Sequence, residues 1–111
     1  MEIIRTGEEK EAIIVAVNGK LDAVTAPDFE KTFSGWINEG ATRFIVDFGE
    51  LTYISSGGFR SILIVTKKLK ETGGKIFLSG LKPAIKKVFD ISGFSVMVPI
   101  YETKESALAA I

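Results

Sequence analysis

The chain contains no cysteine and no histidine. Their absence excludes thiol nucleophiles, disulfides and zinc sites of the ordinary kind, and it removes the commonest general base at neutral pH. A lack of cysteine also agrees with a reducing cytoplasm. We therefore expect a cytoplasmic protein that is not an enzyme and needs no metal or other cofactor.

An excess of charge of one sign is also missing, because the 14 basic and 14 acidic residues cancel. A broad nucleic-acid surface would need clustered excess cations. A small basic run at Lys67, Lys68 and Lys70 is typical of the solvated face of a helix. No apolar run approaches the roughly 20 residues of a membrane helix. The first residues also lack a signal-peptide layout. We expect partners that are neither nucleic acid nor membrane.

Phosphate-binding loops and nucleophile motifs are absent as well. Gly57-Gly58 is followed by Phe-Arg-Ser, which does not match a Walker loop. A serine nucleophile would need a lysine or a carboxylate as its base. Four carboxylates are candidates for a paired-carboxylate site, but helix capping, strand ends and surface exposure explain them better: Asp22, Asp28, Asp47 and Glu50.

What the chain does have is the content and pattern of one mixed α/β domain spanning residues 1–111. A hydrophobic fraction of 46% can fill a single core. Apolar runs predict strands at 2–5, 11–17, 43–48, 75–79 and 96–100, with a polar turn at 7–10, a break at Asn18-Gly19 and a connection at 49–54. Helical spacing predicts helices that begin near Thr25, after Ser55-Ser56, at Leu81 and at Thr103.

This order, ββαβαβαβα, implies parallel crossover units after an initial hairpin. We therefore expect a mixed sheet of about four to five strands, with the helices packed mainly on one side. Within the third helix, Ile85, Val88 and Phe89 are expected to face the core. The apolar stretch 94–101 is expected to be buried in the fold, with an exposed edge near Pro99 as the alternative.

The segment from Tyr53 to Phe59 places two hydroxyls and two glycines at the start of an amphipathic helix. One interpretation is a helix cap, for which serine is a preferred residue. The other is a phosphorylation site, because a helix N-terminus stabilises an added phosphate. The two glycines would leave the backbone uncovered for the close approach of another protein. The residues alone leave both interpretations open, and one serine can serve in both.

Several segments together resemble the STAS domain family (sulphate transporter and anti-sigma factor antagonist), and specifically its stand-alone bacterial anti-sigma factor antagonists. The similarity runs over nearly the whole chain. The matching segments are 19–22, 44–48 continuing through Leu51 to 53–59, 73–75, 81–83 and 88–94. The resemblance implies a single STAS-type domain and a regulatory switch rather than catalysis.

Family members bind an anti-sigma factor that is also a serine kinase with a histidine-kinase-type ATPase fold. Phosphorylation of a serine at the start of the second helix ends this binding, and a PP2C-type phosphatase resets the cycle. On this chain the resemblance places the phosphoacceptor at Ser56, with Ser55 as the alternative, and a family acid at Asp22. It implies a partner-binding surface made of Asp22, Thr25, Ser55, Ser56, Gly57, Gly58, Phe59 and Arg60.

The chain departs from the family pattern at three positions. Ser55 stands where phosphorylated members often have aspartate, Gly57 where serine, alanine or threonine is usual, and Arg60 where glycine is frequent. Arg60 could pair with a phosphate or face solvent. The missing aspartate favours an alternative function, a constitutive STAS interaction module of a sensory or transport complex. A nucleotide-binding protein is the third and least supported hypothesis.

Overall fold

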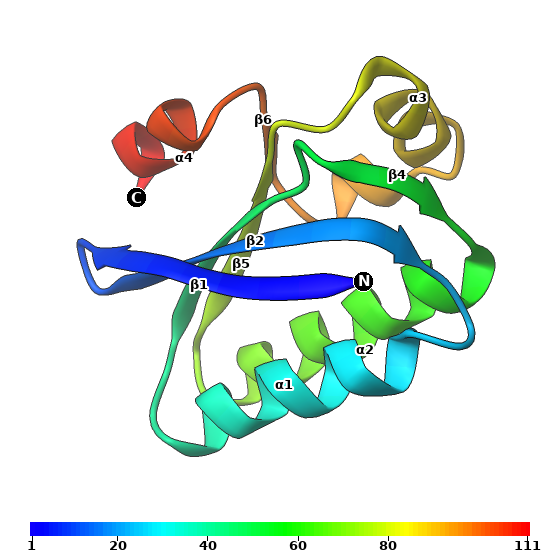
Figure 1. The fold of residues 1–111 in the computed structure, drawn as a ribbon. Helices are drawn as coiled ribbons and strands as arrows, with labels where there is room; N and C mark the ends of the chain where they lie inside the picture. Colours follow the sequence, from blue (N-terminus) through cyan, green and yellow to red (C-terminus); the bar gives the residue numbers. More distant parts are fainter.

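The computed structural model describes residues 1–111. In chain order its elements are β1 (Glu2–Glu9), β2 (Ala12–Leu21), α1 (Ala26–Asn38), β3 (Arg43–Asp47), β4 (Leu51–Ile54), α2 (Ser56–Glu71), β5 (Lys75–Ser79), α3 (Pro83–Ile91), the 3₁₀ turn η1 (Phe94–Val96), β6 (Ile100–Tyr101) and α4 (Lys104–Ala110). Figure 1 shows α1 and α2 side by side beneath the sheet and α4 at its opposite side.

The sheet is mixed, with the order β1-β2-β3-β5-β6. The β1–β2 hairpin is antiparallel, and the other strand pairs are parallel. The hairpin turns at Lys10 and Glu11, both of which have positive φ. Both hairpin strands are therefore longer than predicted, and residues 7–9 belong to β1 rather than to the turn.

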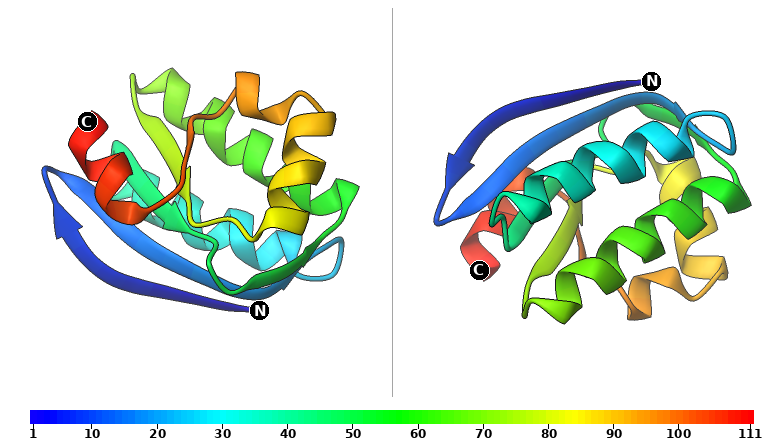
Figure 2. Two further views of the ribbon diagram at one scale, coloured as in Figure 1. Left: turned by 90° about the horizontal axis from the view of Figure 1, so that it is seen from above. Right: turned by 90° about the horizontal axis from the view of Figure 1, so that it is seen from below.

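Helices cover both faces of the central strands, which explains why these strands are apolar throughout. In β3, Phe44 and Val46 join the main core between the sheet and the helices α1 and α2. Ile45 points to the opposite face, where it packs in a smaller cluster with Ala107 of α4. Figure 2 shows the same layering from above and below. The predicted fold class is confirmed, with α4 as the helix on the second face.

One strand was missed in the sequence. Residues 51–54, expected to be a connection, form β4, which pairs in parallel with the last residues of β2. The predicted break at Asn18-Gly19 is wrong for the same reason, since β2 continues past Gly19 (φ 93°) to Leu21. The sheet thus has six strands rather than four to five.

The predicted strand at 96–100 is also wrong. After Gly93, which has a φ of 75°, the chain forms η1, and only Ile100 and Tyr101 are in a strand. Phe94 and Val98 are buried, whereas Val96 and Met97 are exposed. These two exposed residues contradict the expectation that the whole 94–101 stretch is buried.

The last two helices agree largely with the prediction. Thr103 caps α4 by accepting a hydrogen bond from the Ser106 N–H. In α3, Ile85 and Phe89 are buried as expected, but Val88 is 43% exposed. None of the helices combines the length and the apolarity needed to cross a membrane.

Candidate functional site

The predicted site residues come from two segments that meet where β2 ends. The Leu21 carbonyl accepts a hydrogen bond from the Ser55 N–H at 3.0 Å. This bond ties the start of α2 to the turn that follows β2. The topology thereby brings Asp22 and Thr25 to the same end of the fold as Ser55 and Ser56.

Glycine at the first turn of α2 makes this approach possible. An added Cβ at Gly58 would overlap the Leu21 carbonyl oxygen, and one at Gly57 would lie 3.2 Å from the Ala23 Cα. Gly58 is buried, so its backbone is not open to another protein as the sequence suggested. Because Gly58 has no side chain, the first turn of α2 can instead pack closely against the end of β2.

The two serines have different structural roles. Ser55 is the N-cap of α2, and its hydroxyl accepts a hydrogen bond from the Gly58 N–H at 3.2 Å. Ser56, the first residue of the helix, is exposed, and no hydrogen bond occupies its hydroxyl. The cap and the candidate phosphoacceptor are therefore neighbouring residues, and the freely accessible hydroxyl is that of Ser56.

Asp22 organises the turn between β2 and α1. Its Oδ1 accepts hydrogen bonds from the Val24 N–H at 3.0 Å and the Thr25 N–H at 3.1 Å. The pKa of the Asp22 carboxyl is lowered, chiefly by the hydrogen bond from the Thr25 backbone, with further contributions from Val24, the Thr25 hydroxyl and Lys20 that outweigh its desolvation. These hydrogen bonds favour the ionised carboxylate and hold it in the turn between β2 and α1.

The helix predicted to begin near Thr25 is α1, and Thr25 lies directly before it. Thr25 occupies the N-cap position, but its hydroxyl makes no capping bond. Instead the Thr25 hydroxyl donates to the Lys20 carbonyl at 2.9 Å and accepts from the Asp22 N–H at 2.9 Å. Thr25 therefore stabilises the turn beside the site rather than the helix start.

Phe59 and Arg60 point to different surroundings. The Phe59 ring packs against the rings of Phe89 and Phe94, with centroids 4.7 Å and 5.4 Å away. Phe59 is only partly exposed, whereas Arg60 is exposed. Within the predicted surface, Phe59 is thus mainly a packing residue that fixes α3 and η1 against α2.

Sequence reasoning missed one exposed apolar side chain at this site. Val24 lies in the same turn as Ala23 and is 85% exposed. Val24 does not belong to a pattern of apolar residues at helical or strand spacing, so hydrophobic periodicity could not identify it. A single exposed apolar side chain is common on protein surfaces, so Val24 matters here only through its place in the turn that Asp22 organises.

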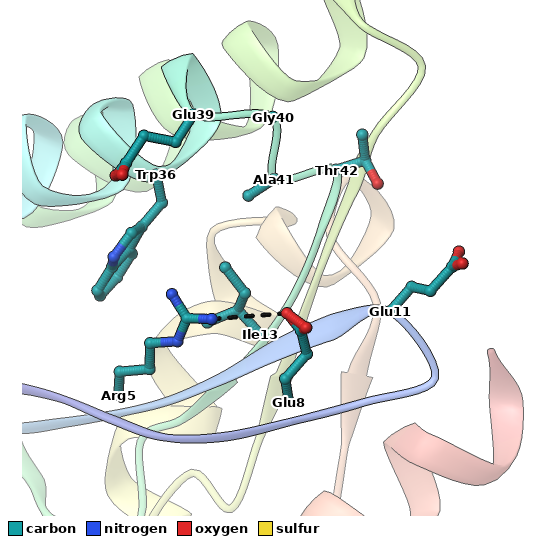
Figure 3. A pocket seen from close by; sticks show the side chains of 9 residues that line it. All are labelled: Arg5, Glu8, Glu11, Ile13, Trp36, Glu39, Gly40, Ala41 and Thr42. Atoms are coloured by element: carbon teal, nitrogen blue, oxygen red, sulfur yellow. Dashed lines mark ion pairs between the residues drawn. The ribbon is translucent and has the colours of Figure 1, made fainter.

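A separate cleft of about 410 Å³ lies between the β1–β2 hairpin and the end of α1. Figure 3 shows Trp36 and Glu39 on one side of it and Arg5 and Glu8 on the other, with the ion pair of the last two at 3.5 Å. None of the predicted site residues lines it. The chain also offers no group of three or more side chains able to hold a metal ion.

Comparison with known proteins identifies the family. The STAS domain family matches residues 4–107, so the chain belongs to it. BtrV of Bordetella bronchiseptica, a candidate anti-sigma factor antagonist, is 36% identical over 98 residues, covering 88% of this chain and 84% of BtrV.

Two solved structures share the fold. A candidate anti-sigma factor antagonist from Thermotoga maritima superposes with a TM-score of 0.88 at 21% identity, covering 95% of this chain and 91% of that one. The phosphorylated form of the Bacillus cell fate determinant SpoIIAA has a TM-score of 0.74 at 24% identity, covering 98% of each chain.

Proposed function

We propose that this chain is a non-catalytic anti-sigma factor antagonist, a cytoplasmic protein that binds an anti-sigma factor and is released by phosphorylation at Ser56. The observation that carries the proposal is the position of Ser56. Its hydroxyl is exposed and unoccupied on the first residue of α2, next to the turn that Asp22 organises. The family match over residues 4–107 and the similarity to BtrV support it.

The geometry suggests how phosphorylation would act. The binding surface consists of the Asp22–Thr25 turn, the exposed Val24 and the first turn of α2. A phosphate on Ser56 adds a charge of about −1.5 to −2. The partner would then face the phosphate together with the Asp22 carboxylate, which lies in the turn that packs against the first turn of α2. Repulsion and the desolvation of the phosphate weaken the complex without any refolding of the chain.

The fold supports this mechanism because α2 is already anchored before any phosphate is added. The Ser55 cap, the Ser55–Leu21 hydrogen bond and the tight seat of Gly58 fix the first turn. Binding to an anti-sigma factor that is also a serine kinase would present the Ser56 hydroxyl to its ATP, and a PP2C-type phosphatase would restore the free hydroxyl.

The test uses lysate of the native cell supplemented with ADP. Immobilised wild-type protein is expected to retain an anti-sigma factor with an ATPase fold, and Ser56→Glu is expected to retain much less. The purified partner with ATP should then phosphorylate wild type and Ser55→Ala but not Ser56→Ala.

The controls separate the acceptor from the function. If Ser55→Ala accepts no phosphate and Ser56→Ala is still phosphorylated, the phosphoacceptor is Ser55. A partner retained equally by wild type and Ser56→Glu, with no phosphate transferred from ATP, would favour the constitutive interaction module. Because Glu carries less charge than phosphate, the enzymatically phosphorylated protein is the stricter comparison.

A further inference from the structure

A second concave surface lies along α2, beyond the proposed phosphorylation site. It is a groove of about 460 Å³ between α2 and the residue that follows η1. Its lining includes Arg60, Leu63, Ile64, Lys67, Lys70 and Met97. Figure 2 shows the orange segment that carries η1 lying beside α2 in both views.

The groove is lined by three apolar side chains, three cations and Thr66. Ile64 is 40% exposed and Met97 is 51% exposed, so the groove presents two large apolar side chains to solvent. Three cations surround them and no carboxylate lines the groove. From the sequence, the basic run that contains Lys67 and Lys70 is interpreted as a solvated helix face. In the structure both lysines also line the groove, which a solvated face alone does not explain.

Ser56 is the first residue of α2 and lies on the same face of this helix as the cations that line the groove. Residues four and seven positions apart share one face of a helix. Ser56 is followed at these spacings by Arg60 and Leu63, and then by Lys67 and Lys70. Arg60 thus lies one turn from Ser56 and is also part of the groove. The groove is continuous with the proposed site.

We infer that this groove binds an acidic amphipathic segment of the partner protein, with an apolar side chain inserted between Ile64 and Met97 and carboxylates paired with Lys67 and Lys70. This inference rests on the proposed function and extends its contact surface along α2. Charge complementarity selects an acidic segment. The hollow shape favours an inserted side chain over the flat surface of a bilayer.

The test measures binding of the partner purified in the retention experiment above. Ile64→Asp and Lys67→Glu are each expected to weaken binding about tenfold, because each places a negative charge against the acidic segment. Ile4→Asp is the matched apolar control, since Ile4 is 43% exposed on β1, far from the groove. Lys31→Glu on α1 is the matched charge control. Both controls should bind like wild type, and circular dichroism should show all four variants folded.

A photo-crosslinker identifies the segment itself. With p-benzoylphenylalanine at position 64, the complex should crosslink to a partner peptide that is net negative and has apolar residues at helical spacing. The inference is overturned if the complex forms with wild-type affinity in both groove variants, or if the crosslinked peptide is basic or absent. Those results would leave the proposed function standing.

Two further outcomes are distinguishable. If wild type retains no anti-sigma factor at all, the proposed function and this inference fall together. If phosphatidylglycerol vesicles sediment wild type but not Lys67→Glu, while the partner binds both equally, the groove is a membrane-binding surface and the inference is wrong.

Discussion

The carbonyl oxygen of Leu21 occupies the space in which a side chain at Gly58 would begin. The same carbonyl accepts the Ser55 N–H at 3.0 Å. The end of β2 and the first turn of α2 are therefore joined by a hydrogen bond and by a contact that only glycine permits. The position of Ser56 depends on this junction.

Gly58→Ala is expected to destabilise the protein by about 1–3 kcal/mol, because the added methyl group forces backbone to move in a packed region. Gly57→Ala is the matched control. Its Cβ would meet Ala23 in an exposed turn that can shift by a few tenths of an ångström, and alanine favours the helix by about 1 kcal/mol. Urea denaturation should therefore show a large loss for Gly58→Ala and little change for Gly57→Ala. Equal losses would contradict the role of the Leu21 contact.

Ser55→Ala and Ser56→Ala should have different effects on the free energy of unfolding. Ser55→Ala removes the cap of α2 and is expected to lower the free energy of unfolding by about 1 kcal/mol. Ser56→Ala removes an exposed hydroxyl with no hydrogen bond and should change it by less than about 0.5 kcal/mol. Thermal denaturation of both variants measures the difference. A larger loss for Ser56→Ala would contradict the assignment of Ser55 as the cap.

Much of this architecture was predictable because its signals are local. Each of the features that were predicted depends only on residues close to it in the sequence. They are the apolar runs of β3 and β5 and the helix caps at Ser55 and Thr103. β4 was missed because it has four residues, of which only Leu51 and Ile54 are buried. Its existence depends on pairing with β2, which is distant in sequence. A four-residue strand with buried ends carries no alternation to detect.

The error at 96–100 has a different origin. The apolar run suggested a strand, but Phe94 and Val98 are the buried members, and they are four residues apart as in a helical turn. In the site, the pairing of Asp22 with the Thr25 backbone could not be read from either residue alone. Both side chains are equally suited to capping the next helix, so local propensity gives no preference.

Asp22 should make stability depend on pH. Its pKa is below the ordinary value of 3.8 in the folded protein, so the unfolded chain binds more protons at acidic pH. The stabilisation is therefore complete above the ordinary pKa and is lost as the pH falls through the folded value. Between about pH 5 and pH 2, the free energy of unfolding should fall less steeply for Asp22→Asn than for wild type. Parallel curves would show that the hydrogen bonds from Val24 and Thr25 do not favour the ionised form.

Phe59 should contribute mainly to stability. Its ring contacts Phe89 and Phe94, so Phe59→Ala is expected to reduce the free energy of unfolding by about 3 kcal/mol. Phe59→Leu keeps most of the volume and should lose less than about 1.5 kcal/mol. If Phe59→Leu retains wild-type affinity for the anti-sigma factor, Phe59 acts through packing. A large loss of affinity at unchanged stability would instead make its ring a contact residue.

Phosphorylation at Ser56 should stabilise the free protein although it weakens the complex. The phosphate lies at the N-terminus of α2, where the helix dipole contributes about 0.3–1 kcal/mol. Arg60 follows four residues later on the same face, so its guanidinium can pair with the phosphate. The melting temperature of protein carrying phosphoserine at position 56 should therefore exceed that of wild type, and Arg60→Ala should reduce the increase. A melting temperature that falls on phosphorylation would show that release works by disrupting α2, and not by changing the charge of an intact surface.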